Sequence, residues 1–226
     1  MPTYHLQKMN KSVNLSYFFY RINSMKKLKS IIYGLVITLL IAISIQANAQ
    51  NIYQLNVQKS DLVVKGTSTL HDWSMDSKNF NCKMNSTSSE KSLIIQKIDF
   101  SCNSNSLKSE NSLMDKKAWS ALEAYKFHKI QFESTNQEEF TWDNKNIEGE
   151  INGTLLLTGK KKDITIPFKG VIDNDGNLKV TGEVSIKMSE FGIDPPTALL
   201  GSLKTGDEVT IEYNLLFNKA GLVTEN

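Results

Sequence analysis

Apolar and polar residues alternate in five stretches of the chain, at 62–68, 94–102, 164–169, 180–188 and 209–217. Alternation with a period of two gives a strand with one apolar face and one polar face. In the second stretch, the apolar face is expected to hold Ile94, Ile98, Phe100 and Cys102. Turn-forming residues separate the stretches at 85–92, 143–146 and 173–177. The pattern therefore predicts antiparallel strands joined by short turns.

Two segments interrupt the alternation. Residues 111–124 have helical periodicity, with Leu113 and Trp119 on one side. Residues 191–203 contain two consecutive prolines, which do not fit a central strand. We expect a helix in the first segment, and a loop with a short helical turn in the second.

About eight strands in up-and-down order, with one short helical insertion, predict an all-β domain that is either a closed antiparallel barrel or a sandwich. A barrel of this size can hold a small ligand. The strands expected at 147–160 and 177–188 are long, so such a barrel would be tall enough for an elongated molecule. Glycines such as Gly153 and Gly182 fall on the inward phase, where they either leave room in a lumen or only allow the strands to coil.

The beginning of the chain has the pattern of an export signal. Met25 opens a short basic stretch, residues 31–45 are almost wholly apolar, and Ala47-Asn48-Ala49 matches a cleavage site. This apolar run is short for a membrane span, which takes about 20 residues. We therefore expect a signal peptide at 25–49 and a periplasmic or secreted mature domain at 50–226. Residues 1–24 precede a good start at Met25 and are expected to be a misassigned upstream extension.

Removing the first 49 residues reverses the net charge. The whole chain has 26 basic and 24 acidic residues, and six of the basic ones precede residue 50. The mature domain is left with 20 basic and 24 acidic residues, a net charge of −4. A mildly acidic domain with scattered lysines is not expected to bind nucleic acid.

The chain has two cysteines, Cys82 and Cys102, both at apolar-face positions. In an oxidising compartment they can pair as a disulfide, or they can remain as reduced thiols on neighbouring strands; the sequence favours neither. Two cysteines without a histidine at ligand spacing do not make a zinc site, so we expect no metal and no cofactor.

The pair His71-Asp72 is the strongest suggestion of catalysis, because it could be two members of a hydrolase triad. However, adjacent residues on a strand point to opposite faces, and the chain has no Gly-x-Ser-x-Gly nucleophile motif. We therefore favour a structural corner in which Trp73 packs, and a protein that is not an enzyme. A hydrolase that uses His71 and Asp72 stays the less favoured alternative.

Two further groups have a structural and a functional interpretation. The lysine run 160–162 is expected to lie in a solvated turn, and the alternative is contact with an anionic lipid head group at a barrel mouth. Trp119, Leu122, Tyr125 and Phe127 are expected to pack in the core, and the alternative is that they cap the barrel mouth. Neither group identifies a reaction.

Five motifs, taken in order, resemble those of YceI-like domains of the type found in Bacteroidetes. The first is Gly66-Thr67-Ser68-Thr69-Leu70-His71-Asp72-Trp73, which resembles the family motif G-x-S-T-x-H-D-W. The others lie at 113–117 with the helix that follows, at 129–134, at 153–162, and in the closing segments 191–196 and 206–211. The resemblance covers essentially the whole mature domain. The chain departs from the family in two places: His128-Lys129 stands where many members have Pro, and Met114 where many have Arg.

The resemblance implies an extended, lipocalin-like barrel of eight antiparallel strands. It also implies a central apolar channel that binds polyisoprenoid or another long-chain lipid in the periplasm, and it implies no catalytic residues. The function we expect is therefore that of an exported carrier for a long apolar ligand. The alternative is a structural barrel whose interior is filled by its own side chains, and a monomer and a homodimer are both compatible with the sequence.

The inward faces of the predicted strands should line this channel. An apolar lumen suits a hydrocarbon chain, because burying each CH₂ contributes about 0.8 kcal/mol. A chain of about fifteen carbons would gain roughly 10 kcal/mol before the costs of binding are subtracted. Tyr213 would add one polar group. The expected lining is Val64, Ile98, Phe100, Phe132, Leu155, Leu157, Ile164, Ile166, Phe168, Val184, Ile186, Ile211 and Tyr213.

We predict that the exported protein begins at Gln50, because Ala47-Asn48-Ala49 offers the small residues that a signal peptidase requires. Intact-mass measurement and N-terminal sequencing of exported material would check this. Material that begins upstream of Ile31 would contradict cleavage and favour a membrane anchor.

Overall fold

The computed structural model describes residues 20–21, 51–89, 91–198 and 201–219. The expected signal peptide at 25–49 and the expected mature start at Gln50 lie outside these residues. Among the helices of the described segments, none combines the length and the apolar character that crossing a membrane requires.

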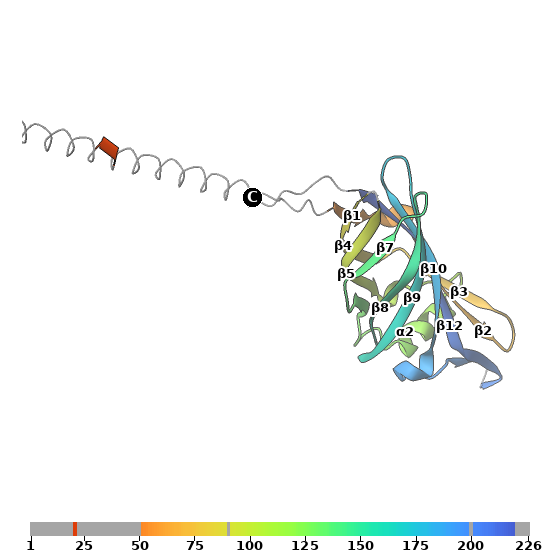
Figure 1. The fold of residues 1–226 in the computed structure, drawn as a ribbon. Coiled ribbons are helices and arrows are strands. Elements are labelled where there is room, and N and C mark those ends of the chain that lie inside the picture. Colours follow the sequence, from red (N-terminus) through yellow and green to blue (C-terminus); the bar gives the residue numbers. More distant parts are fainter. Residues whose placement is uncertain (1–19, 22–50, 90, 199–200, 220–226) are drawn as a thin grey trace, which may run out of the picture. The chain divides into compact units, whose positions relative to one another are not determined.

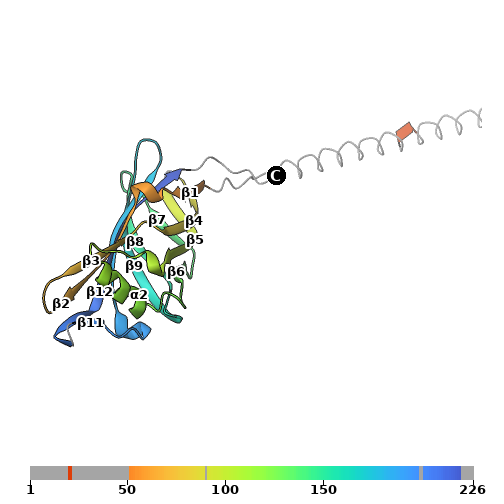
Figure 2. The same cartoon turned by 180° about the vertical axis from the view of Figure 1, so that it is seen from behind.

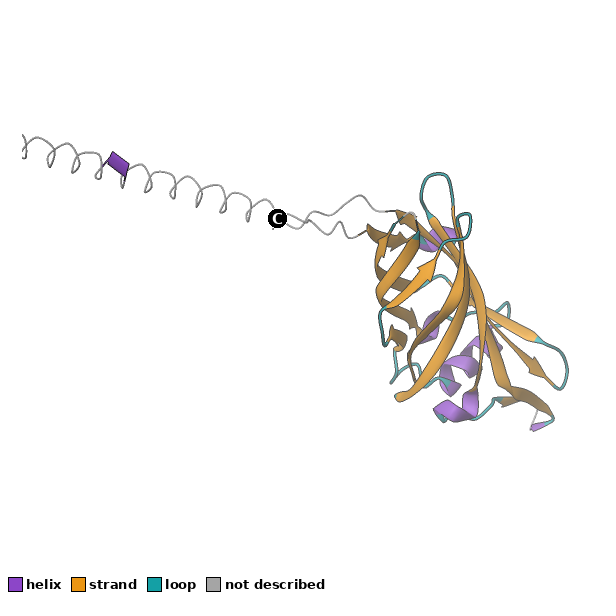
Figure 3. Cartoon of the chain, viewed as in Figure 1, coloured by secondary structure: helices purple, strands orange, loops and turns teal. Residues whose placement is uncertain are grey.

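Strands make up almost the whole wall of the domain (Figures 1 and 3). An α-helix and short 3-10 helices interrupt them among the described residues that follow residue 50. The strands are β1 (Asn51–Leu55), β2 (Asp61–Ser68), β3 (Trp73–Ser77), β4 (Phe80–Ser88), β5 (Ser92–Asn103), β6 (Lys129–Ser134), β7 (Glu138–Thr141), β8 (Asn146–Leu157), β9 (Lys160–Ile172), β10 (Leu178–Lys187), β11 (Thr197–Ala198) and β12 (Leu203–Lys219). The helices are η1 (Val57–Lys59), η2 (Ser104–Ser106), α2 (Ser112–Ala121) and η3 (Met188–Phe191).

The strands form an antiparallel sheet that closes on itself. Its order is β1-β4-β5-β6-β8-β9-β10-β12, and β12 pairs with β1 to complete the ring, with Phe217 opposite Leu55. β2 and β3 continue the positions of β1 and β4, since β2 pairs with β12 and with β3. β7 pairs with β5 beyond the end of β6. The result is the closed eight-strand antiparallel barrel that the sequence predicts, and the sandwich alternative is wrong.

A buried serine holds the place where β1 gives way to β2. Ser60 is fully buried, and its Oγ donates a hydrogen bond to the carbonyl of Asn56 at 2.7 Å. The same Oγ accepts one from the backbone N–H of Leu216 at 2.9 Å. The hydroxyl therefore replaces a ladder bond to β12 at the point where η1 breaks the strand.

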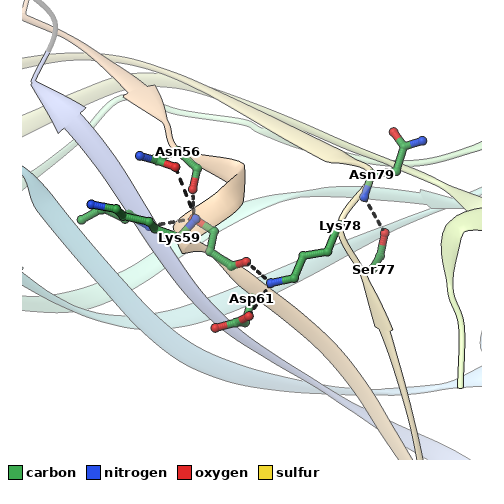
Figure 4. Close-up of polar contacts among 8 residues, drawn as sticks. Asn56, Lys59, Asp61, Ser77, Lys78 and Asn79 are labelled. Atoms are coloured by element: carbon green, nitrogen blue, oxygen red, sulfur yellow. Dashed lines mark hydrogen bonds and ion pairs between the residues drawn. The ribbon is translucent and has the colours of Figure 1, made fainter. Parts of the chain in front are cut away.

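The neighbouring break, between β3 and β4, lies beside the first one (Figure 4). Lys78 occupies this break, and its Nζ donates to the Ser60 carbonyl at 2.7 Å and pairs with Asp61 at 2.5 Å. The Ser77 hydroxyl accepts the backbone N–H of Asn79 at 3.1 Å. These contacts join two interrupted strands so that the wall stays continuous.

The expected phase of β5 is wrong at its beginning. Leu93 and Ile95 are buried at 0% and 4% exposure, whereas Ile94, which we expected inside, is only half-buried. The register of β5 against β4 shifts between Asn85 and Ser86, so one residue is inserted near Gln96. A β-bulge of this kind exchanges inward and outward positions, which explains why the alternation from Ile98 onward does not extend back to Ile94.

Two turns lie elsewhere than expected. β4 continues to Ser88, so the turn that we expected at 85–92 is confined to the residues after it. The strand that we expected at 147–160 ends at Leu157, and Thr158 and Gly159, with φ of 49° and 75°, form a tight hairpin to β9. The lysine run 160–162 is consequently the start of β9 and not a turn.

The two ends of the barrel differ in their cover. α2, the β2–β3 connection and β11 gather at one end, as Figures 1 and 2 show from opposite sides. We call it the α2 end. The opposite end carries β1, β7 and the hairpin between β9 and β10. Helical segments therefore cover the α2 end, where a barrel mouth lies.

We predict that Ser60→Ala lowers the free energy of unfolding by about 1–3 kcal/mol, because it leaves the buried N–H of Leu216 without its acceptor. Lys78→Met should cost about 1 kcal/mol or less, since the Lys78–Asp61 pair is exposed to solvent. Urea unfolding of both variants would measure the difference. Equal losses would contradict the role given to the serine.

Candidate functional site

A cavity of about 550 Å³ lies inside the barrel. Its wall comes from β2, β3, β4, β5, β6, β8, β9, β10 and β12, and α2 and the loop before β11 border it. Sites for small organic ligands usually measure about 300–1,000 Å³ and are mostly apolar. The barrel therefore encloses a space of the size and character of a ligand site.

The structure brings together on the cavity wall every residue that we expected to line the channel. Those thirteen are Val64, Ile98, Phe100, Phe132, Leu155, Leu157, Ile164, Ile166, Phe168, Val184, Ile186, Ile211 and Tyr213. Many of them, including Val64, Val184 and Ile211, face inward and yet are only half-buried. Part of the surface of each of these side chains faces the cavity and not another side chain, so the middle of the barrel is hollow.

The end opposite α2 is closed by packed side chains. Leu93, Leu178 and Phe217 are 0%, 1% and 3% exposed, and all three also border the cavity. They form its floor, where three strands contribute large apolar groups to a filled core. The cavity is thus closed at this end, and its wall is apolar down to this floor.

Polar groups gather where the cavity reaches the α2 end. They come from the end of β2 and its turn, from α2 with its cap, and from the strands β11 and β12. These side chains are Ser68, His71, Asn111, Lys117, Thr197 and Thr205. The mouth is therefore polar while the interior is apolar, and Leu113 stands at the mouth with 69% exposure.

Tyr213 is a polar group deeper in the wall. Its hydroxyl donates to the carbonyl of Pro167, across a stretch in which β9 and β10 are no longer paired, since their ladder covers only Thr181 and the residues before it in β10. Burial raises the pKa of this phenol to about 12, so it stays neutral at physiological pH. Its oxygen keeps a lone pair that can accept a hydrogen bond.

The glycines of the wall do not enlarge the cavity. A Cβ on Gly182 would lie 2.2 Å from the Tyr213 hydroxyl, and one on Gly153 would lie 2.3 Å from the ring of Phe132. Aromatic side chains already occupy the space that the missing Cβ atoms leave. Of the two interpretations given to these glycines, room in the lumen is therefore wrong at both positions.

The geometry at His71-Asp72 is that of a corner. The His71 Nδ1 lies 2.8 Å from the backbone carbonyl of Asp72, while the Ser68 Oγ donates to the His71 carbonyl and accepts the N–H of His71. The Trp73 indole N–H donates to the carbonyl of Thr67, and its ring covers Gly66. The imidazole contacts a carbonyl and not the neighbouring carboxylate, so this is not a triad arrangement.

The helix at the mouth is fixed by its own polar contacts. Asn111 caps α2 by accepting the N–H groups of Leu113 and Met114. The buried carboxylate of Asp115 accepts the hydroxyl of Ser109 at 2.7 Å.

On the same helix, the Trp119 indole donates to the Leu107 carbonyl, and Leu122 borders the cavity. Tyr125, in contrast, is 79% exposed, and Phe127 lies against Gly159 of the β8–β9 hairpin. The four aromatic and apolar residues that we considered together are therefore divided among packing, the mouth and the surface.

Both cysteines border the cavity as free, buried thiols. Cys82 lies opposite Phe100 and Cys102 opposite Phe80, so the two are diagonal neighbours. Diagonal Cα atoms are about 7–8 Å apart, farther than disulfides usually allow. Burial, and after it the charge of Asp99, raises the pKa of Cys82 to about 12. The described residues hold no group of three potential metal ligands.

Sequence reasoning missed much of the wall from β3, β4 and the strand ends. The missed positions include Leu62, Met75, Met84, Leu93, Ile95, Ile151, Leu178, Val180, Leu215 and Phe217. Alternation was a sufficient signal for several of them, such as Leu215 and Phe217, which share the phase of Ile211. The bulge concealed the inward position of Ile95, and the alternation of apolar and polar residues did not extend to most residues of the mouth.

The fold is similar to that of several solved structures. Burkholderia cenocepacia BcnA matches with a TM-score of 0.57 and 15% identity, over 72% of this chain and 98% of its own. A polyisoprenoid binding domain from Saccharophagus degradans, implicated in plant cell wall breakdown, matches with a TM-score of 0.57 and 12% identity, over 75% and 99%. The Campylobacter jejuni YceI protein matches with a TM-score of 0.51 and 20% identity, over 65% and 84%.

No curated protein matches the sequence. The model of the YceI-like domain, in contrast, matches residues 53–217, which extend from β1 to the end of the barrel wall in β12. Both the order of motifs and the closed barrel agree with that match. The chain therefore belongs to the family of YceI-like domains.

Proposed function

We propose that this protein is an exported carrier that holds one long apolar chain, a polyisoprenoid or another lipid, inside its barrel. The observation that carries the proposal is the hollow middle of the barrel. Apolar side chains such as Val184 and Ile211 face the axis and stay half-buried around a space of about 550 Å³. Binding of an apolar molecule to such a surface is favourable, because both apolar surfaces are then removed from water.

The chemistry of the wall suits a hydrocarbon. Within the cavity, polar side chains are confined to the mouth and to Tyr213. Each CH₂ transferred from water contributes about 0.8 kcal/mol, so a chain of about fifteen carbons gains roughly 10 kcal/mol before the costs of binding. A wall of this kind distinguishes ligands by length and thickness, and it tolerates different head groups.

The comparisons support the same class of ligand. The neighbour from Saccharophagus degradans is a polyisoprenoid binding domain, and its barrel and this one share a fold. The pattern at 25–49 supports delivery of the mature domain, 50–226, to the periplasm or the exterior. A ligand that does not dissolve in water needs a carrier in an aqueous compartment.

Catalysis is not part of the proposed function. The imidazole of His71 contacts a backbone carbonyl, and the side chain of Asp72 is exposed beside it. A hydrolase would need a nucleophile within hydrogen-bond reach of that imidazole. We also propose no cofactor and no nucleic-acid partner, in keeping with the acidic mature domain.

We predict that Val184→Trp abolishes uptake of a fluorescent long-chain fatty acid, because the indole would fill the lumen. The free energy of unfolding should stay within about 1 kcal/mol of wild type, since overpacking of a filled core costs roughly 1–3 kcal/mol and this core is hollow. Glu183→Trp, on the outer face of the same strand, is the matched control and should bind normally. Fluorescence titration and urea unfolding of the three proteins measure both effects.

These measurements, together with an organic extract of wild type and a His71→Ala variant, separate the alternatives. A structural barrel predicts that wild type takes up no lipid, that organic extracts of it contain none by mass spectrometry, and that Val184→Trp is strongly destabilised. A hydrolase predicts that His71→Ala removes the turnover of an ester substrate. Either result would replace the carrier function.

A further inference from the structure

We propose that the α2 end of the barrel is a docking surface for an anionic lipid bilayer, and that the ligand exchanges there. This inference rests on the carrier function proposed above, because it states where the carrier meets the source of its ligand. Four observations support it: exposed apolar side chains, their place at the mouth, two clusters of lysine, and the apolar path that leads inward.

Large apolar side chains are exposed at this end. Leu70 and Leu113 are each 69% exposed, and Tyr125 is 79% exposed. Leu70 lies in the β2–β3 connection and Leu113 on α2, two elements that gather at the same end in both views (Figures 1 and 2). Among the described residues at the opposite end, Val171 is the exposed large apolar side chain, and it is less exposed, at 48%.

The exposed leucines are next to the cavity. Leu113 both projects into solvent and borders the cavity, and Leu70 precedes His71, which borders it as well. Transfer of a leucine side chain from water to an apolar environment is favourable, so these two residues favour insertion into lipid. Inserted leucines would extend the apolar wall of the pocket directly into the bilayer.

The helix surface around Leu113 is basic. Lys116 and Lys117 follow Leu113 at the i+3 and i+4 positions and are therefore its neighbours on the helix surface. The only acidic residue of α2, Asp115, is buried against Ser109. An exposed leucine flanked by two lysines, without an exposed carboxylate on the helix, has the pattern of a helix that lies on anionic lipid.

The lysine run 160–162 forms a second basic cluster at the same end. It begins β9 directly after the hairpin that contacts Phe127, and Lys160 reaches Gly192 beyond η3. Exposed acids such as Glu110 and Asp194 lie in the loops of this end as well. The electrostatic attraction to an anionic bilayer is therefore local. It comes from two clusters of lysine on a domain whose net charge is −4.

The physical reason for docking is the ligand itself. A long apolar chain that crossed water alone would expose its whole apolar surface, which is strongly unfavourable. Contact between the mouth and the bilayer removes that barrier, because the chain then passes from lipid into the pocket without becoming hydrated.

Lys117 also joins α2 to β11, donating to the carbonyl of Thr197 at 2.7 Å, so the rim is held as one surface.

The test compares two double variants that differ in which end of the barrel they change. Leu70→Asp with Lys116→Glu alters the α2 end at two exposed residues outside the cavity wall. Val171→Asp with Lys179→Glu makes the same chemical changes at two exposed residues that face each other across β9 and β10. Co-sedimentation of the purified protein is measured with vesicles of phosphatidylcholine alone and with vesicles that also contain phosphatidylglycerol.

We expect wild type and the Val171 variant to bind the anionic vesicles equally, and the Leu70 variant to bind at least about tenfold more weakly. Binding to the anionic vesicles should also decline as salt is added. Absence of wild-type binding, or equal losses in the two double variants, would overturn the proposal. Thermal unfolding of each variant serves as the control for folding.

A second measurement keeps this inference separate from the carrier function. The Leu70 variant should take up a fluorescent fatty acid supplied in water to the wild-type extent, while uptake of the same probe from anionic vesicles becomes slower. Unchanged uptake from vesicles would overturn the docking surface and leave the carrier function intact. Absence of uptake by wild type, with vesicle binding retained, would overturn the carrier function and the exchange of ligand at the α2 end, and would leave the docking surface intact.

Discussion

Closure of the hydrogen-bond ladder is the constraint on which the rest of this structure depends. A domain with a hollow interior forgoes part of the close packing that stabilises other proteins of its size, so it depends strongly on the hydrogen bonds of its wall. β12 is central to this, because it pairs with β10, β2, β1 and β11 along its length. Where regular pairing fails, side chains substitute for it: Ser60 beside β12, and Tyr213 between β9 and β10.

The barrel divides its two tasks between its two ends. Near the β9–β10 hairpin, large side chains such as Leu178 and Phe217 fill the interior and supply a core. Toward α2, apolar residues of the wall such as Val64 and Ile211 border the cavity and are only half-buried. Stability and capacity thus come from different stretches of the same strands, which allows the cavity to be changed without removing the core.

Alternation along the chain was sufficient to predict the barrel and much of its lining, because a period of two determines which side chains face inward. It failed where the backbone departs from that period. The bulge near Gln96 exchanged Ile94 and Ile95, and the hairpin at Thr158 ended β8 before the expected position. The mouth could not be predicted, because the side to which Leu113 points depends on how α2 packs on strands distant in sequence.

A polar mouth above a closed apolar floor has a consequence for the order of events. A pocket of this kind admits an amphiphile tail first and leaves its head group beside Lys117 and His71, so every occupant would sit in one direction. Because the floor is closed, a new occupant cannot displace the old one by pushing from behind, and an occupant that enters by the mouth leaves by the mouth. In a carrier built this way, the acceptor that draws the chain out would set the residence time of the ligand. The acceptor, and not the carrier, would then determine where the ligand is released.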